Sequence, residues 1–188
     1  EAEIFKKTLE FLFRIQGKDG SWDESQKVLR YNPPSWDTPG ELKNKMWITA
    51  EVTNLLIEAS YKNSFEVKKA CDFLISNREE DGKFFGYKIT TWISIPIFKN
   101  LEREDIFENS LRLAREWIDE ENDAAFINWY LECLSAAKIS KKDFLFKKCL
   151  KKLAELQKEN GSWSSVDGKR YTVSTTLNAL KFLLLSKK

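Results

Sequence analysis

Apolar residues recur along this chain at intervals of three and four, the spacing that places them on one face of an α-helix. Phe146, Cys149, Leu150 and Leu153 follow this spacing, and lysines fill the positions between them. The helical segments come in pairs joined by turns that contain glycine or acidic residues. The pairs cover residues 3–60, 64–101, 105–139 and 141–186. The pattern predicts an all-α fold of α-α hairpin repeats, with about eight helices in a single domain over residues 1–188.

A long loop interrupts the first pair. Residues 23–43 contain Trp36 together with three prolines and a glycine, and loops of this length in a compact domain tend to be functional or mobile. The loop either covers one rim of the helices or inserts Trp36 as a plug at the top of the core. We favour the plug, which predicts that Trp36→Ala destabilises the fold.

Proline interrupts an apolar run in the second pair. Pro96 lies within residues 90–98, where it predicts a kink or the start of a new helix. The β-branched residues before Pro96 also allow a short extended segment at this point.

Two turns of the sequence are near copies of each other. Residues 16–22 read Gln-Gly-Lys-Asp-Gly-Ser-Trp and residues 157–163 read Gln-Lys-Glu-Asn-Gly-Ser-Trp, so both fit Q-x-x-x-G-x-W, and residues 81–84 form a weaker third copy. The glycine tolerates the positive φ that a reversal after a helix requires. The glutamine side chain can hydrogen-bond to backbone groups that are unpaired at the helix ends, while the tryptophan ring covers the end of the hairpin. This predicts a link between neighbouring hairpins.

This pattern resembles the QW motif of the terpenoid cyclase and prenyltransferase superfamily, as in squalene-hopene cyclase-like repeats. Residues 47–56 and 174–180 are similar to that family's inner helices. The resemblance implies an α/α toroid, in which inner and outer helices form a ring. Since a complete ring of this family has six hairpins and this chain shows four, we expect a partial or small toroid. An arc exposes apolar surface, so a protein partner, self-association or the remainder of a longer chain is expected to cover it.

The residues that carry the family's chemistry are missing. The positions of the D-x-D-D acid read Lys-Met-Trp-Ile at 45–48 and Arg-Tyr-Thr-Val at 170–173, and the zinc site of protein prenyltransferases needs a histidine, of which the chain has 0. No cysteine lies in the family's thioester motif. The resemblance therefore implies a non-catalytic module that binds a protein partner or an apolar or anionic ligand. The alternative is a prenyltransferase or terpene cyclase whose catalytic residues come from a missing portion or another subunit.

Composition further limits the classes of function that this chain can have. Lysine and arginine number 31 against 29 acidic residues, a net charge of +2, which does not favour nucleic-acid binding. No apolar stretch reaches the ~18 residues of a membrane-spanning helix. Cys71, Cys133 and Cys149 lack metal-ligand spacing and lie on apolar faces, which predicts buried free thiols, a reducing compartment and a cytoplasmic location. We expect no cofactor, and we interpret the acidic residues 119–123 as a solvated turn, not a metal site.

Two groups of residues on the expected inner helices are candidates for ligand binding. Aromatic residues there, Trp47, Trp92 and Trp129 with Phe98 and Tyr130, either line a pocket for an isoprenoid or other apolar ligand or simply fill the core. Basic residues lie where these helices begin and would converge on one rim as a cradle for phosphate or carboxylate. The predicted ligand-binding residues are Lys45, Trp47, Lys88, Trp92, Trp129, Lys169 and Arg170.

Overall fold

The described chain folds entirely into helices and loops. The structure, a computed structural model, describes residues 2–185. Its α-helices are α1 (Ala2–Ile15), α2 (Leu42–Glu58), α3 (Phe65–Ser76), α4 (Lys88–Asn100), α5 (Glu104–Trp117), α6 (Ala124–Ala136), α7 (Phe144–Glu155) and α8 (Thr172–Leu185). The short 3-10 helices are η1 (Gln26–Tyr31), η2 (Ser35–Asp37) and η3 (Lys169–Tyr171). The predicted all-α fold with about eight helices is confirmed, and the predicted end of the fourth pair at residue 186 lies outside the described residues.

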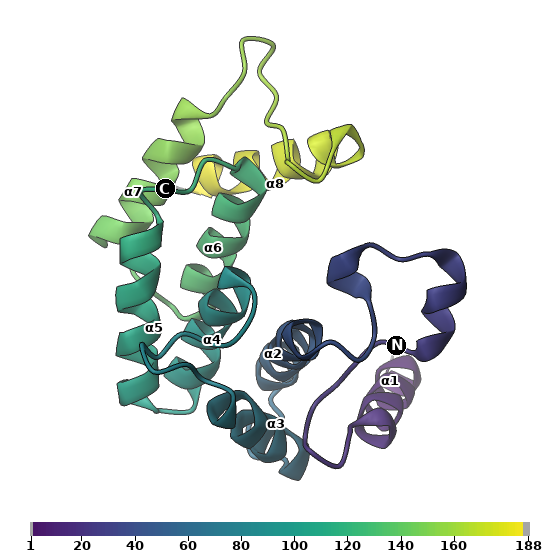
Figure 1. Ribbon diagram of the computed structural model, residues 1–188. Helices are drawn as coiled ribbons and strands as arrows, with labels where there is room; N and C mark the ends of the chain where they lie inside the picture. The colour runs from purple at the N-terminus through teal and green to yellow at the C-terminus, as the bar shows by residue number, and fades with distance from the viewer. Residues whose placement is uncertain (1, 186–188) are drawn as a thin grey trace.

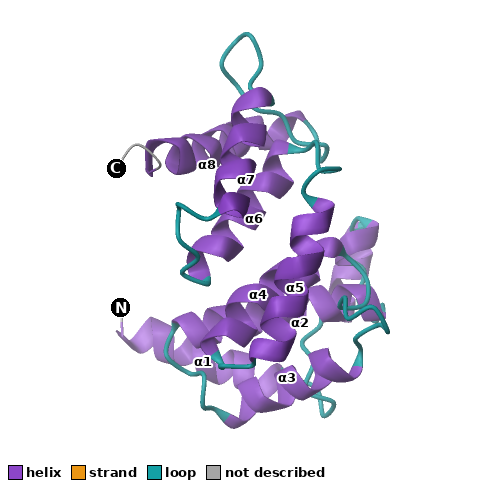
Figure 2. Cartoon of the chain, turned by 90° about the vertical axis from the view of Figure 1, so that its left-hand side faces the viewer, coloured by secondary structure: helices purple, strands orange, loops and turns teal. Residues whose placement is uncertain are grey.

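The helices form an open arc of hairpins (Figure 1). Helices α2, α4, α6 and α8 contact one another in this order, and α3, α5 and α7 contact α2, α4 and α6 from outside. Helices α1 and α8 lie at the two ends of the arc in both views (Figure 2). Within residues 2–185, no helix is both long enough and apolar enough to span a membrane.

Side-chain caps fix where several outer and inner helices begin. The Ser64 hydroxyl accepts a hydrogen bond from the Val67 amide at the start of α3, and Asp143 accepts one from the Leu145 amide at the start of α7. Such caps satisfy amides that have no partner within the helix and stabilise it by about 1 kcal/mol each.

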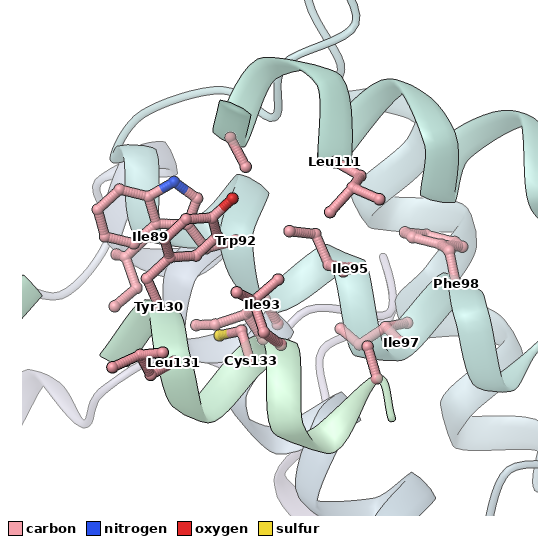
Figure 3. Close-up of a cluster of buried hydrophobic side chains, with 14 of the residues drawn as sticks. Ile89, Trp92, Ile93, Ile95, Ile97, Phe98, Leu111, Tyr130, Leu131 and Cys133 are labelled. Carbon is pink, nitrogen blue, oxygen red and sulfur yellow. The ribbon is translucent and has the colours of Figure 1, made fainter. Parts of the chain in front are cut away.

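Helix α4 is the centre of the core. Its residues 89–98 are all buried, because α4 contacts α2, α5 and α6. Figure 3 shows its isoleucines and Trp92 among side chains from the neighbouring helices. Pro96 lies inside this helix, which continues past it to Asn100, so the expectation of an extended segment or a new helix was wrong. Burial on every side outweighs the ~3 kcal/mol by which proline disfavours a helix interior.

The three cysteines are free and buried, as predicted. Desolvation raises the pKa of Cys71 and that of Cys149 to about 12, and it also raises the pKa of Cys133. A thiol with a raised pKa carries little thiolate at neutral pH and is unreactive.

The first hairpin turn, residues 16–22, is fixed by its tryptophan. The Trp22 indole N–H donates to the Leu12 carbonyl over 2.8 Å, and the Trp22 amide donates to Thr49 Oγ1 over 2.9 Å. The first bond holds the ring against the end of α1, and the second joins the turn to α2. Trp22 therefore links both helices of its hairpin.

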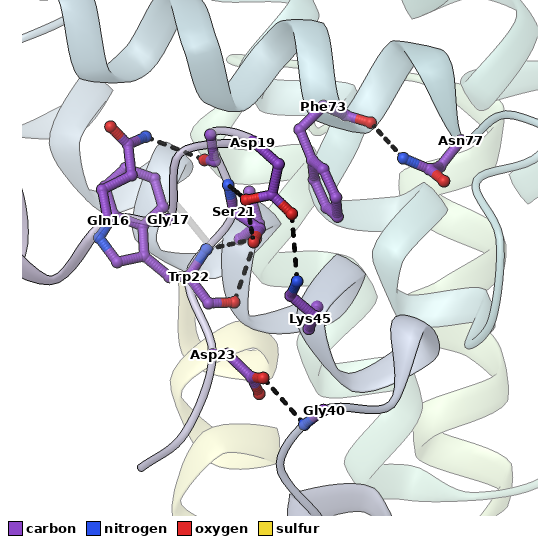
Figure 4. Close-up of polar contacts among 12 residues, drawn as sticks. Gln16, Gly17, Asp19, Ser21, Trp22, Asp23, Gly40, Lys45, Phe73 and Asn77 are labelled. Carbon is purple, nitrogen blue, oxygen red and sulfur yellow. Dashed lines mark hydrogen bonds and ion pairs between the residues drawn. The ribbon is translucent and has the colours of Figure 1, made fainter. Parts of the chain in front are cut away.

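The same turn also joins the first hairpin to the second. The Gln16 amide nitrogen donates to the Gly20 carbonyl and to the Glu66 carbonyl, each over 2.9 Å, and Glu66 lies in the first turn of α3. Lys69 on α3 donates to the Gly17 carbonyl over 3.3 Å. Figure 4 shows this turn and the residues around it. The predicted link between neighbouring hairpins is present here.

The fourth hairpin turn, residues 157–163, repeats these bonds within its own hairpin. Trp163 donates from its indole to the Leu153 carbonyl over 2.6 Å and from its amide to Thr176 Oγ1 over 3.1 Å. Gln157 donates to the Gly161 carbonyl over 3.0 Å. The two turns thus share one conformation, and they differ in that only the first is covered by a following outer helix among the described residues.

Candidate functional site

Aromatic side chains surround a cavity of about 510 Å³ on the inner side of the arc. Its wall draws on α2, α4, α6 and α8 and on the loops before α2 and α8. A cavity of this volume accommodates a drug-sized molecule. The aromatic residues of the wall are Trp36, Trp47, Tyr87, Trp92, Phe126, Trp129 and Tyr171.

The aromatic rings hold one another in edge-to-face arrangements. Trp47 meets Trp36 with ring centroids 5.9 Å apart and Tyr87 with centroids 6.1 Å apart. On the other side, Phe126 lies edge-on to both Trp92 and Trp129. Such pairs add about 0.5–1.5 kcal/mol each beyond the apolar area they bury. The wall is therefore built before any ligand arrives.

The long loop supplies Trp36 to this wall. Asn44, buried in the first turn of α2, donates hydrogen bonds to the Ser35 carbonyl over 2.9 Å and the Thr38 carbonyl over 2.8 Å, and these bonds hold η2 in place. Trp36 remains 37% exposed. The expectation that Trp36 plugs the core was wrong, because Asn44 anchors the loop by its backbone and leaves the indole at the cavity.

Two buried polar atoms in residues of this wall have no hydrogen-bond partner within residues 2–185. They are the indole nitrogen of Trp92 and the side-chain oxygen of Asn128, whose amide nitrogen donates to the Thr175 carbonyl over 3.0 Å. Leaving a buried donor or acceptor unpaired costs about 1–3 kcal/mol. Both atoms are enclosed by protein, so neither is open to the cavity.

The structure brings together some of the predicted ligand-binding residues and separates the rest. Trp47, Trp92, Trp129 and Lys88 all line the cavity. Phe98 and Tyr130, also considered for a pocket, are buried in the core, where Tyr130 stacks on Trp92 with centroids 5.2 Å apart.

The other three predicted basic residues do not line the cavity. Lys45 forms an ion pair of 3.1 Å with Asp19 in the first hairpin turn (Figure 4). Lys169 and Arg170 are exposed in η3, and the Arg170 guanidinium lies over the Tyr171 ring. The sequence places all of these residues near helix starts, but it does not show which way each long side chain turns.

The charge around the cavity is net negative. Lys88 lies 3.8 Å from Glu120, and the carboxylates of Glu121 and Asp167 also belong to the cavity wall. One lining lysine with an acidic neighbour and two lining acidic residues leave an excess of negative charge. This charge disfavours an anion relative to an uncharged ligand.

The acidic residues 119–123 organise the third hairpin turn. Asp123 accepts hydrogen bonds from the Ala125 and Phe126 amides at the start of α6, and its other oxygen accepts one from the Val166 amide over 2.7 Å. Within residues 2–185, no group of three or more acidic or cysteine side chains is arranged to hold a metal ion. The carboxylate of Asp123 therefore caps a helix and ties it to the following loop.

Sequence reasoning missed two half-buried carboxylates on the inner helices. Burial raises the pKa of Glu51 on α2, although the Trp47 indole donates to that carboxylate over 3.3 Å. Burial also raises the pKa of Glu132 on α6, and Lys181 opposes this shift. The only sequence signal was their position among apolar neighbours on inner helices.

We expect Glu51→Gln to stabilise the protein at neutral pH and to leave it unchanged in acid. A raised folded-state pKa means that the folded chain binds the proton more tightly, so stability falls as pH rises from the unfolded pKa through the folded one. Glutamine removes this loss and keeps an acceptor for Trp47. Thermal melts of both proteins at pH 7 and pH 3 measure the effect, and an equal difference at both pH values would contradict it.

The chain was compared with family models, curated proteins and solved structures. No family model, no curated protein and no solved structure matches the chain.

Proposed function

We propose that this chain is a non-catalytic binding module that holds an uncharged, largely apolar ligand in the aromatic cavity. The cavity of about 510 Å³, walled by Trp36, Trp47, Trp92 and Trp129, is the observation that carries the proposal. Aromatic walls of this kind bind apolar molecules by burying their surface, which contributes about 25 cal/mol for each Å² removed from water.

The charges of the wall narrow the ligand chemistry. Glu121 and Asp167 line the cavity with a single lysine, Lys88, so a negatively charged group is disfavoured there. A hydrocarbon chain that ends in an uncharged hydroxyl, such as a prenyl alcohol, suits both the aromatic wall and these charges. This ligand class agrees with the isoprenoid ligand that the QW-like turns imply.

Binding of farnesol tests the proposal directly. We expect saturable binding by isothermal titration calorimetry or by quenching of tryptophan fluorescence. Binding should be weaker for farnesyl diphosphate, which brings a strong negative charge to Glu121 and Asp167. The hydrocarbon without the hydroxyl should still bind, because the aromatic wall supplies the contact. Absence of saturable binding by all three compounds would refute the proposed function.

The variant Trp36→Ala is expected to weaken farnesol binding about tenfold, since removing one aromatic wall costs about 1.4 kcal/mol of contact. Trp36 lies on a loop and is partly exposed, so the melting temperature should change little. Phe85→Ala is the matched control, because Phe85 has similar exposure and does not line the cavity. Equal binding by both variants would show that the ligand lies elsewhere.

The alternative function is an isoprenoid-converting enzyme. An aromatic cavity stabilises carbocations by cation–π interaction, and this feature favours the alternative. Incubation with farnesyl diphosphate and with squalene, followed by product analysis, separates the two functions. Formation of a cyclised or transferred product would overturn the non-catalytic proposal.

A further inference from the structure

At each junction between hairpins, a side chain on an outer helix donates a hydrogen bond to the preceding turn. Lys69 on α3 donates to the Gly17 carbonyl, and Asn109 on α5 donates to the Asp81 carbonyl over 3.4 Å. Lys152 on α7 donates to the Ile118 carbonyl over 2.7 Å. The described part of the chain therefore uses one rule at all of its internal junctions.

In each of these junctions the turn supplies the carbonyl acceptor and the following outer helix supplies the donor. The fourth hairpin turn has the acceptor carbonyl, but no described outer helix follows it to supply a donor. In the first turn, a Cβ added to Gly20 would overlap the Lys69 carbonyl group, because α3 lies directly against it. At the equivalent Gly161, the only atom within 4 Å of such a Cβ is in Gln157, at 4.0 Å. Among the described residues, no following outer helix packs against Gly161 as α3 packs against Gly20.

Helix α8 extends this uncovered surface. Thr176 and Thr49 accept hydrogen bonds from the amides of Trp163 and Trp22, respectively, so they occupy equivalent positions. Aligning α8 with α2 on these two residues shows which face of α8 corresponds to which face of α2. On α2 this face is buried, since α2 contacts α3 and α4 of the next hairpin. Its residues are Met46, Ala50, Thr53 and Ile57. On α8 the equivalent residues are large, apolar and exposed, and they are Val173, Leu177, Leu180 and Leu184.

Helix α1 has a lysine at the position of the donor on α3. Residues 16–22 align with residues 78–84 at a shift of 62, and this shift places Lys7 at the position of Lys69. It also places Phe5 and Phe11 at positions that α3 buries. On α1 both phenylalanines are exposed, and Lys7 makes only an exposed pair with Glu3. The residues of α3 equivalent to Phe5 and Phe11 are Val67 and Phe73, and both are buried.

We propose that two copies of this chain associate head to tail, with α1 of one copy on the fourth hairpin turn and α8 of the other. The contact repeats the junction between the first and second hairpins. Lys7 then donates to the Lys158 carbonyl, which aligns with that of Gly17, and Gln157 donates to a carbonyl in the first turn of α1. The apolar faces of the two ends cover each other.

A head-to-tail contact joins two different surfaces. After one such contact, one copy keeps a free α8 end and the other keeps a free α1 end, so the contacts either close into a ring of two or more copies or continue as an open chain. This differs from a symmetric contact of α8 with α8, which buries one surface against itself. The difference gives the experiment its design.

Charged substitutions at either end test the proposal. We expect the unmodified chain to dimerise or form larger assemblies as concentration rises, measured by sedimentation velocity. Leu177→Glu at the α8 end should at least tenfold weaken self-association, and Phe11→Glu at the α1 end should do the same. These side chains are 61% and 48% exposed, so both variants should fold, as circular dichroism checks. Phe65→Glu is the control, since Phe65 is 70% exposed and lies on α3, outside the two helices proposed to meet.

Mixing the two variants distinguishes the geometry. Leu177→Glu keeps an intact α1 end and Phe11→Glu keeps an intact α8 end, so the mixture should form a pair containing one chain of each. A mixture that stays monomeric while the unmodified chain associates would overturn the head-to-tail arrangement. An unmodified chain that remains monomeric at every concentration would overturn self-association altogether and would point to a different protein segment as the occupant.

Discussion

Replacing Gly20 by alanine is expected to destabilise the protein by about 2–5 kcal/mol. Gly20 has φ of +90°, where a side chain adds about 1–2 kcal/mol of strain, and its Cβ would overlap the Lys69 carbonyl group on α3. To relieve this overlap, α3 must move away from the turn, which lengthens the hydrogen bond from Gln16 to the Glu66 carbonyl. This movement adds about 1–3 kcal/mol to the loss of stability. Denaturant unfolding measures the total.

The chain contains its own control for this prediction. Gly161 has φ of +82° in a turn with the same hydrogen bonds, and a Cβ there meets only Gln157 at 4.0 Å. Gly161→Ala should therefore show the backbone strain alone, about 1–2 kcal/mol. The excess loss in Gly20→Ala isolates the contact between hairpins. Equal losses in the two variants would show that the first turn does not hold α3 in place.

The sequence predicted the fold well because its strongest signals are local. The apolar spacing that contains Cys149 and Leu153 fixes a helix and its buried face without knowledge of the neighbours. The glycine and tryptophan of each turn likewise act within one hairpin, as the bonds of Trp22 and Trp163 show. The extended segment and the new helix considered at Pro96 were wrong, because the effect of this proline depends on the helices that surround α4, which the local sequence does not reveal.

The site was predicted only in part, because it depends on side-chain directions and on contacts between distant segments. Trp47, Trp92 and Trp129 follow from helical spacing, and they line the cavity. Lys45 turns to Asp19, which lies 26 residues earlier, and Trp36 reaches the cavity because Asn44 holds its loop. Neither contact falls at the three- or four-residue spacing of a helix, so the periodicity of the sequence does not predict it.

The variant Trp163→Ala is expected to cost about 3–5 kcal/mol, the usual range for removal of a buried tryptophan. Trp163 is only 1% exposed, and its indole bond to Leu153 fastens the turn to α7. Within residues 2–185, α8 contacts mainly α6, with smaller contacts to η3 and α7, so the described part of the fourth hairpin has a neighbouring hairpin on one side. In repeat proteins stability depends on such neighbour contacts, and a terminal hairpin that loses its link opens by itself.

Hydrogen exchange locates this opening. In Trp163→Ala, the amides of α7 and α8 should lose protection by about two to three orders of magnitude, since 1.4 kcal/mol corresponds to a factor of ten, while those of α4 stay protected. Trp163→Phe retains most of the buried ring and should lose far less. Because Thr175 and Asn178 of α8 form part of the cavity wall, farnesol binding should fail as α8 opens, even though α4 remains folded. Equal loss of protection in every helix would mean that the arc unfolds as one unit, and the cavity would then depend on the whole chain instead of on its last hairpin.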